Sequence, residues 1–202
     1  MTVTVLLADD ENLVRSAMRA LLALESDFDI VAEAASGGEA LAMARRHQPH
    51  VALLDLQMPA PDGIAVAEVL RDELPATKTV IVTSHGRAGH LKRALSAGVR
   101  GFLPKTVSSG VLADVVRTVH DGGRYIDPEL AAEAISAGES PLTPREADAL
   151  ELAAGGAPVE EIALRVSLSP GTVRNYLSSC VTKLGVSNRH EAVEVARRHG
   201  WI

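Results

Sequence analysis

The sequence predicts an α/β domain built on a doubly wound parallel sheet, followed by a smaller domain made of helices alone. In the first 122 residues, apolar and β-branched runs alternate five times with helical patterns. This alternation is the order of an open parallel sheet with helices on both faces. From residue 141 onward, four capped helical patterns follow one another without a strand-like run. We expect residues 123–140, which lie between these regions, to form a linker.

The first domain is expected to have (βα)5 architecture. Its strands are predicted at residues 2–8, 28–34, 50–55, 79–84 and 99–105, and its helices at 13–24, 37–47, 63–74, 89–98 and 107–123. The strands are almost continuously apolar, which is typical of a sheet covered on both faces. Two helices carry apolar stripes that we assign to the core, with a dimer surface as the alternative: Val14, Ala17, Met18, Leu21 and Leu22 in the first, and Val115, Val116 and Val119 in the fifth.

The second domain is predicted from helix caps. Thr143 and Glu146 form a capping box with Pro144 at the first helical position. Further helices are expected at 158–166, 170–184 and 188–200, and a weaker one at 128–137 within the linker. Because a short turn separates 158–166 from 170–184, the pair is predicted to be a helix-turn-helix. The expected division is therefore 1–122, 123–140 and 141–202.

Composition narrows the class of protein. The chain has 20 Lys and Arg against 26 Asp and Glu, and residues 141–202 carry 7 of each. Neither part is strongly basic, so any DNA contact must come from a local face. No apolar run is long enough to span a membrane, and the N-terminus does not resemble a signal peptide. With a single cysteine, Cys180, we expect a cytoplasmic protein without an internal disulfide.

Charged and polar residues gather where the predicted strands end. Asp9 and Asp10 follow the first strand, Asp55 ends the third, Thr83 lies at the end of the fourth and Lys105 ends the fifth. These positions share the carboxyl edge of a parallel sheet, where ligands bind. Hard oxygen ligands suit Mg²⁺. A carboxylate can also act as a nucleophile toward phosphorus, with Lys105 and Thr83 holding the phosphoryl oxygens.

This set, together with Met58-Pro59, resembles the receiver domain of two-component response regulators over residues 3–122. The resemblance implies that Asp55 accepts a phosphoryl group from a sensor histidine kinase, and that Asp9, Asp10, Asp55 and the backbone carbonyl of Gln57 hold Mg²⁺. It also implies that Thr83 and Lys105 sense the phosphoryl group and that Phe102 is the aromatic switch. Two features depart from the family. Lys105 is preceded rather than followed by proline, so a cis bond after it would be a costly non-proline one, and Phe102 lacks the hydroxyl of the more common tyrosine.

The expected second helix of the helix-turn-helix bears Arg174, Asn175, Ser178 and Lys183 and no acidic residue. Such a helix is compatible with a phosphate-lined groove. The stretches LTPRE, EEIA, SPGTVRNYLSS and TKLGVSNRHEA resemble the LuxR-type DNA-binding domain, and a receiver followed by this domain is the arrangement of the NarL/FixJ family. The resemblance implies that Arg174, Asn175 and Ser178 face base edges, while Ser169, Thr172, Lys183 and Arg189 contact phosphates.

The expected function is therefore regulation of transcription, in which phosphorylation of Asp55 promotes a homodimer that binds double-stranded DNA. A regulator that works without phosphorylation is one alternative. An aspartyl-nucleophile phosphohydrolase is a weaker one, because such enzymes carry a second Asp two residues after the nucleophile, where this chain has Gln57. The sequence does not identify the signal, the kinase or the target genes, and it leaves open which receiver surface dimerises.

Overall fold

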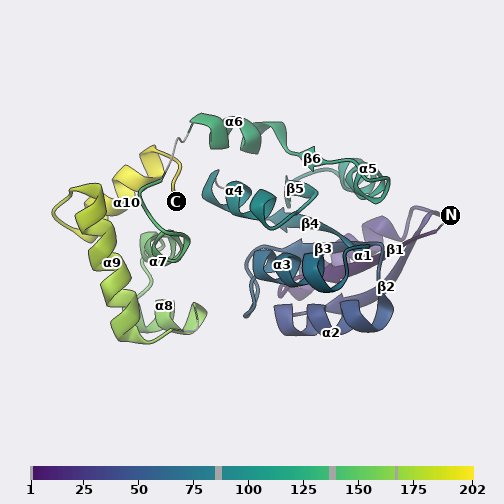
Figure 1. The fold of residues 1–202 in the computed structure, drawn as a ribbon, viewed down its shortest axis with the longest axis horizontal. Helices are drawn as coiled ribbons and strands as arrows, with labels where there is room; N and C mark the ends of the chain where they lie inside the picture. Colours follow the sequence, from purple (N-terminus) through teal and green to yellow (C-terminus); the bar gives the residue numbers. More distant parts are fainter. Residues whose placement is uncertain (1, 85–87, 137–139, 167) are drawn as a thin grey trace. The chain divides into compact units, whose positions relative to one another are not determined.

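The computed structural model describes residues 2–84, 88–136, 140–166 and 168–202 (Figure 1). The chain separates into two compact units. One comprises Met1–Gly86 and Leu91–Pro128, and the other Arg87–His90 and Glu129–Ile202. Each unit has a hydrophobic core of its own, so each is described separately.

The first unit is built on a parallel six-stranded sheet with the strand order β2-β1-β3-β4-β5-β6. Its strands are β1 (Val3–Ala8), β2 (Phe28–Ala34), β3 (Val51–Asp55), β4 (Lys78–Thr83), β5 (Gly101–Pro104) and β6 (Tyr125–Ile126). The five expected strands are all present. The short β6 pairs with Gly101 and Phe102, within the stretch that the sequence assigned to a linker. The strand order reverses between β1 and β3, and such a reversal opens a crevice at the carboxyl edge of the sheet.

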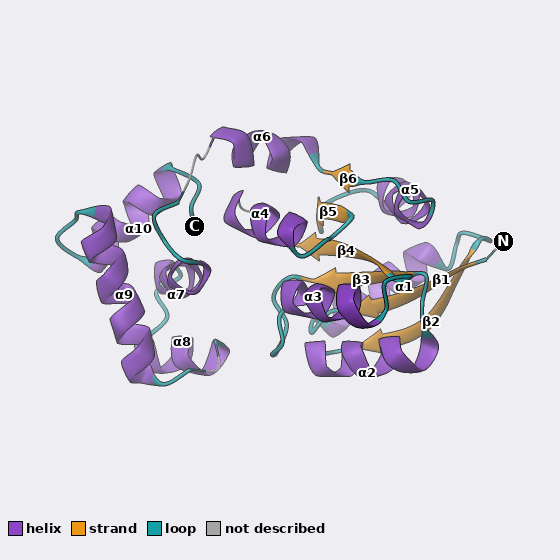
Figure 2. Ribbon diagram, in the orientation of Figure 1, coloured by secondary structure: helices purple, strands orange, loops and turns teal. Residues whose placement is uncertain are grey.

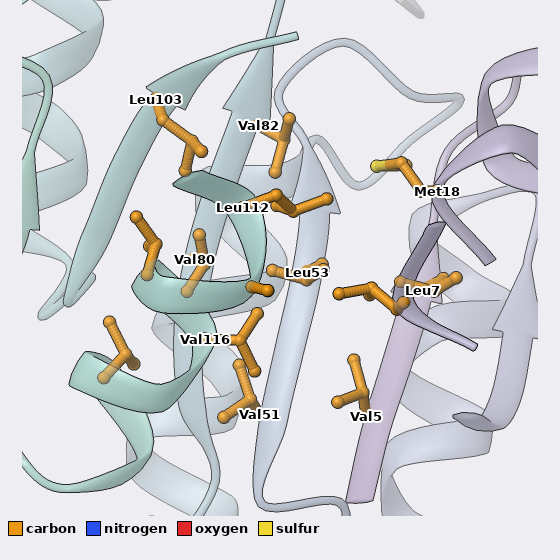
Figure 3. Close-up of a cluster of buried hydrophobic side chains, with 14 of the residues drawn as sticks. Val5, Leu7, Met18, Val51, Leu53, Val80, Val82, Leu103, Leu112 and Val116 are labelled. Carbon is orange, nitrogen blue, oxygen red and sulfur yellow. The ribbon is translucent and has the colours of Figure 1, made fainter. Parts of the chain in front are cut away.

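Five helices accompany these strands (Figure 2). They are α1 (Asn12–Leu22), α2 (Gly37–His47), α3 (Gly63–Glu73), α4 (Ala88–Ser96) and α5 (Ser109–His120). On one face of the sheet, side chains of α1 and α5 pack with alternate residues of the strands, among them Leu7, Leu53 and Val80 (Figure 3). On the other face, α2 and α3 contact each other, with α2 against β1 and β2 and α3 against β4. Both faces are covered, as the apolar strands predicted.

The α1 stripe is only partly core. Met18 and Leu22 are buried, as are Val115, Val116 and Val119 of α5. By contrast, Ala17 is exposed and Leu21 is 38% exposed, so assigning them to the core was wrong. Only one side of α1 packs against the sheet. Ala17 and Leu21 lie on the solvent-exposed side of the helix. Leu13 and Leu24 are also exposed, at 82% and 80%.

The second unit is entirely helical in the part that the structure describes. It contains α6 (Pro128–Ser136), α7 (Pro144–Ala154), α8 (Val159–Arg165), α9 (Pro170–Leu184) and α10 (Arg189–Arg198). The capping box of Thr143 and Glu146 begins α7, and Ser169 and Asn188 cap α9 and α10, as expected. Helices α7, α8 and α10 pack around α9. The expected end of α6, Ala137, lies outside the described residues. Within the described ranges, no helix is long and apolar enough to cross a membrane.

Candidate functional site

The sheet brings four of the predicted site residues to one edge. Asp9 directly follows β1, Asp55 ends β3, Thr83 ends β4 and Lys105 directly follows β5. Strand register aligns these ends, because Ala8 pairs with Leu54 and Thr83 pairs with Pro104. The Lys105 backbone N–H donates to the Thr83 carbonyl at 2.8 Å, which extends the β4–β5 ladder to the lysine itself. The topology therefore brings the predicted side chains to the same edge of the sheet.

The Lys105 ammonium group is the centre of this cluster. Its Nζ lies 2.8 Å from Asp9 Oδ2, 3.1 Å from Glu11 Oε1 and 3.4 Å from Asp55 Oδ1. The lysine side chain is only 9% exposed. The sequence-based prediction missed Glu11, although it directly follows the acidic pair and is a third carboxylate in the same loop. Lys105 is thus held among several carboxylates, one of which is Asp55.

The acidic residues are arranged as a cation site. Carboxylate oxygens of Asp9, Asp10 and Asp55 all lie within 4.8 Å of one another. Asp9 is fully buried, its Oδ1 accepts from the Glu11 N–H at 2.9 Å, and its Oδ2 is paired with the Lys105 ammonium at 2.8 Å. Buried charge is costly unless it is compensated, and the Lys105 ammonium alone does not neutralise these three carboxylates. The residues present therefore fit a metal ion with hard oxygen ligands.

Electrostatics at this edge perturb both Asp55 and Lys105. Burial raises the pKa of Asp55 to about 6, and the nearby Asp9 and Asp10 carboxylates add to the rise while Lys105 opposes it. Burial alone would lower the pKa of Lys105, but its contacts with Asp9 and Asp55 outweigh burial and raise it. A cation near Asp55 would favour its ionised, nucleophilic form.

The remaining predicted receiver residues lie in β4, in β5 and in the loop after β3. Thr83 is buried at the end of β4, and Phe102 is buried within β5, each 1% exposed. Gln57 lies in the loop after Asp55 with its side chain exposed. Among the described residues the only cis peptide bond joins Ala60 to Pro61, so the bond after Lys105 is trans. The roles of Thr83 and Phe102 in sensing, and of the Gln57 carbonyl in metal binding, stay predictions.

In the helical unit, α9 has one buried face and one exposed face. Val173, Leu177 and Cys180 are buried, whereas Arg174, Asn175 and Ser178 are exposed. At about 100° per residue, these three exposed positions share one side of the helix. The Arg174 guanidinium lies 3.2 Å from Glu160 of α8, and both side chains remain more than 60% exposed. The predicted base-reading residues therefore form one accessible polar face.

The predicted phosphate-contacting residues differ in their surroundings. Ser169 caps α9, because its Oγ accepts from the Thr172 N–H at 3.1 Å, and the two hydroxyl groups lie 2.9 Å apart. Arg189 is the first residue of α10 and is half-buried. Lys183 lies on the flank of α9 that faces α7, with its Nζ 2.7 Å from Glu146 Oε2. Contact of these residues with DNA stays a prediction.

Glu146 is an organising residue that the sequence indicated only as a helix cap. Its carboxylate accepts from the Thr143 N–H at 2.7 Å, the Ser179 hydroxyl at 2.6 Å and the Lys183 ammonium at 2.7 Å. Burial alone would raise the pKa of Glu146, but these hydrogen bonds, first that from Lys183, outweigh burial and lower the pKa to about 2. One buried carboxylate therefore joins the start of α7 to the C-terminal half of α9.

Comparison with known proteins finds a matching family for each of the two units. Residues 5–117 match the response regulator receiver domain, and residues 140–196 match the luxR family of bacterial regulatory proteins. The chain belongs to the response regulators that join a receiver domain to a LuxR-type DNA-binding domain, and it is a two-component transcription regulator of that family.

Similarity to individual relatives extends over the whole chain. The transcriptional regulatory protein DesR of Bacillus subtilis is 38% identical over 200 residues, covering 99% of both chains. The stretches 172–178 and 184–192 suggest this likeness from the sequence alone. UhpA of Escherichia coli is 40% identical over 201 residues, covering 98% of this chain and 100% of its own. The RcsB response regulator of Salmonella typhimurium has the same fold, with a TM-score of 0.78 at 24% identity over 98% of each chain.

Proposed function

We propose that this protein is a cytoplasmic transcription regulator whose binding to DNA is controlled by phosphorylation of Asp55 by a sensor histidine kinase. The observation that carries the proposal is the position of Asp55. Its carboxylate is 5% exposed at the carboxyl edge of the sheet, with the Lys105 ammonium 3.4 Å away and the carboxylates of Asp9 and Asp10 beside it. A buried carboxylate in this setting is suited to accept a phosphoryl group and to retain it.

The transfer exchanges one bond to phosphorus for another. An Asp55 carboxylate oxygen attacks the phosphorus, the bond from phosphorus to the imidazole nitrogen of the kinase breaks, and that nitrogen leaves with the electron pair. The Lys105 ammonium is close enough to Asp55 Oδ1 to move to a phosphoryl oxygen on that residue. A charge-assisted hydrogen bond from Lys105 would then hold the phosphoryl group. Thr83, at the end of the neighbouring strand, would supply a hydroxyl group on the same side.

Mg²⁺ is the ion that we assign to the acidic cluster, held by Asp9, Asp10, Asp55 and the Gln57 carbonyl. It would supply neutralisation of charge on the phosphoryl oxygens. The carboxylates of Asp9, Asp10 and Asp55, which converge within 4.8 Å and exceed the charge of the Lys105 ammonium, support this assignment. The Glu11 N–H donates to Asp9 Oδ1, so the Asp9 carboxylate is oriented before an ion arrives.

For the helical unit, we propose that α9 enters the major groove of double-stranded DNA. Arg174 can pair bidentately with guanine and Asn175 with adenine, with Ser178 on the same exposed side. Ser169, Thr172, Lys183 and Arg189 are assigned to phosphates, which set the register of the helix. The ion pair of Arg174 with Glu160 is exposed on both sides, so breaking it to contact a base costs little.

We further propose that phosphorylation promotes a homodimer through the exposed side of α1 and the turn that follows it. Leu13 and Leu24 are at least 80% exposed, and Leu21, Ala17 and Ala20 are exposed between them. An apolar strip of this kind on a folded domain is typical of a protein interface. A second copy is the occupant that a regulator reading a two-fold half-site pair requires.

The test is phosphorylation of the full chain by acetyl phosphate and Mg²⁺, followed by intact mass. We expect the wild type and the surface control Asp72→Asn to gain one phosphoryl group, and Asp55→Asn to gain none. Equal phosphorylation of Asp55→Asn would contradict the assignment. Many turnovers of acetyl phosphate per site would favour a phosphohydrolase, and unchanged DNA affinity on phosphorylation would favour a regulator that does not use Asp55.

A further inference from the structure

The loop that follows Asp55 packs closely against two glycines, each of which is the first residue of a helix. Gly63 begins α3 and Gly37 begins α2. Neither is among the glycines of the described chain that have a positive φ. The backbone conformation at these positions therefore does not require glycine, and the reason for glycine is the space that a side chain would fill.

Gly63 packs on the backbone of the phosphoacceptor itself. A Cβ atom added to Gly63 would lie 2.1 Å from the Asp55 carbonyl oxygen, and the Gly63 N–H donates to the Leu56 carbonyl at 3.1 Å. The start of α3 thus supports the residue that ends β3 and the first residue of the loop.

Gly37 supports the middle of the same loop from a different part of the chain. A Cβ atom added to Gly37 would lie 1.8 Å from the Pro61 carbonyl oxygen, and the Gly37 N–H donates to the Pro59 carbonyl at 3.1 Å. This end of α2 is fixed in turn, because the Glu39 N–H donates to Ser36 Oγ at 3.2 Å and the Ala35 N–H donates to Glu39 Oε2 at 2.8 Å.

We infer that Gly37 is a positioning residue for the phosphoacceptor loop, an inference that rests on the proposed role of Asp55. The loop is supported at Asp55 by Gly63 and at Pro59 and Pro61 by Gly37, and Gln57 lies between these supports. An alanine Cβ must move from 1.8 Å to at least 3.0 Å from the Pro61 oxygen. The loop or the start of α2 must therefore shift by more than an ångström, and a displacement of that size passed on to the reacting group can cost about a hundredfold in rate.

The neighbouring glycine provides a matched control. Gly38 is exposed in the same first turn of α2, and a Cβ added to it meets no atom within 4 Å. The variants Gly37→Ala and Gly38→Ala add the same methyl group to the same helix. Both gain the same helix propensity, so a difference between them reports the contact with the loop.

The experiment measures, on the folded full-length chain, the Mg²⁺ dissociation constant by calorimetry and the maximal rate of phosphorylation by acetyl phosphate. We expect Gly37→Ala to weaken Mg²⁺ binding about fivefold and to lower the maximal rate about 10- to 100-fold. The acetyl phosphate concentration at half-maximal rate should change little. Gly38→Ala should match the wild type in all three quantities.

The inference would be overturned if Gly37→Ala and Gly38→Ala had the same Mg²⁺ affinity and the same maximal rate. A loss in rate that matches the unfolded fraction of Gly37→Ala would also overturn it. If that variant does not fold, Ser36→Ala decides, because it loosens the start of α2 without added bulk. Weaker Mg²⁺ binding by Ser36→Ala supports the inference and unchanged binding overturns it. If the wild type binds Mg²⁺ but takes no phosphoryl group, the proposed function fails, and the Mg²⁺ comparison alone still tests Gly37.

Discussion

Removing the charge of Glu146 should destabilise the helical unit far more than removing the charge of another helix-capping glutamate. A carboxyl group whose pKa is lowered from 4.5 to about 2 by folding is stabilised by about 3 kcal/mol. Because its partner Lys183 is 36% exposed, solvent screening reduces the expected loss in Glu146→Gln to about 2 kcal/mol. The matched control is Glu191→Gln, whose exposed carboxylate accepts from the Ser187 N–H and the Asn188 side chain at the start of α10. We expect that change to cost about 0.5 kcal/mol.

The chain offers a reporter for this unit alone. Trp201 is the single tryptophan, and it packs against the core of the helical unit. Urea denaturation of the full-length protein, followed by tryptophan fluorescence, therefore reports unfolding of that unit. With a slope of about 1 kcal/mol per molar urea for a small domain, Glu146→Gln should lower the midpoint by about 2 M. A midpoint equal to that of Glu191→Gln would refute the reasoning.

The same residue predicts a dependence on pH. Between pH 4.5 and about 2 the unfolded chain protonates Glu146 while the folded chain keeps it ionised. The unfolded state then binds more protons, so the stability contributed by Glu146 is complete above pH 4.5 and is lost as the pH falls toward 2. The advantage of the wild type over Glu146→Gln should therefore shrink on acidification. A constant difference from pH 7 to pH 3 would contradict this account.

Three further outcomes are expected. Leu24→Glu should weaken self-association of the phosphorylated protein at least about tenfold in sedimentation, whereas Leu164→Glu, at a residue of equal exposure on α8, should not. Equal effects would exclude the apolar strip from Leu13 to Leu24 as the dimer surface. Arg117→Ala removes contacts with Glu25, Asp27 and the Phe28 ring, and should lower the melting midpoint of the receiver unit by about 4 °C. The control Arg19→Ala loses only an exposed ion pair with Glu33. It should change the midpoint by less than about 1 °C. Cys180 is buried and burial raises its pKa to about 12, so Ellman's reagent should label the native protein at least about a hundredfold more slowly than the urea-unfolded protein; equal rates would show that α9 is not packed as described.

The residues of the acidic edge could be predicted because a parallel sheet has one simple rule. Whatever follows the carboxyl ends of neighbouring strands meets at one edge, so Asp9, Asp55 and Lys105 could be placed together before their distances were known. Glu11 was missed because its contact with Lys105 depends on the path of the loop and not on strand order. Gly37 was missed for the same reason, since a close approach of two loops leaves no periodic pattern in the sequence.

In the helical unit, too, local features could be predicted from the sequence, whereas contacts between helices could not. Caps and proline positions predicted the starts of α7, α9 and α10, because those signals are local. The ion pair of Lys183 with Glu146 joins two helices, so the lysine could not be distinguished from a free phosphate contact by sequence alone. The outer side of α1 was misassigned because an apolar stripe looks the same whether it faces a sheet or a surface. The two-residue strand β6 was too short to give an alternating pattern.

The central claim is that phosphorylation of Asp55 controls recognition of DNA. The most direct measurement is enrichment of genomic fragments on the purified full-length protein, with and without acetyl phosphate and Mg²⁺, beside Asp55→Asn. The account predicts that the phosphodonor concentrates binding of the wild type on a few sites with two-fold symmetry and leaves Asp55→Asn unchanged. Identical sites and affinities for the wild type with and without the phosphodonor would contradict it.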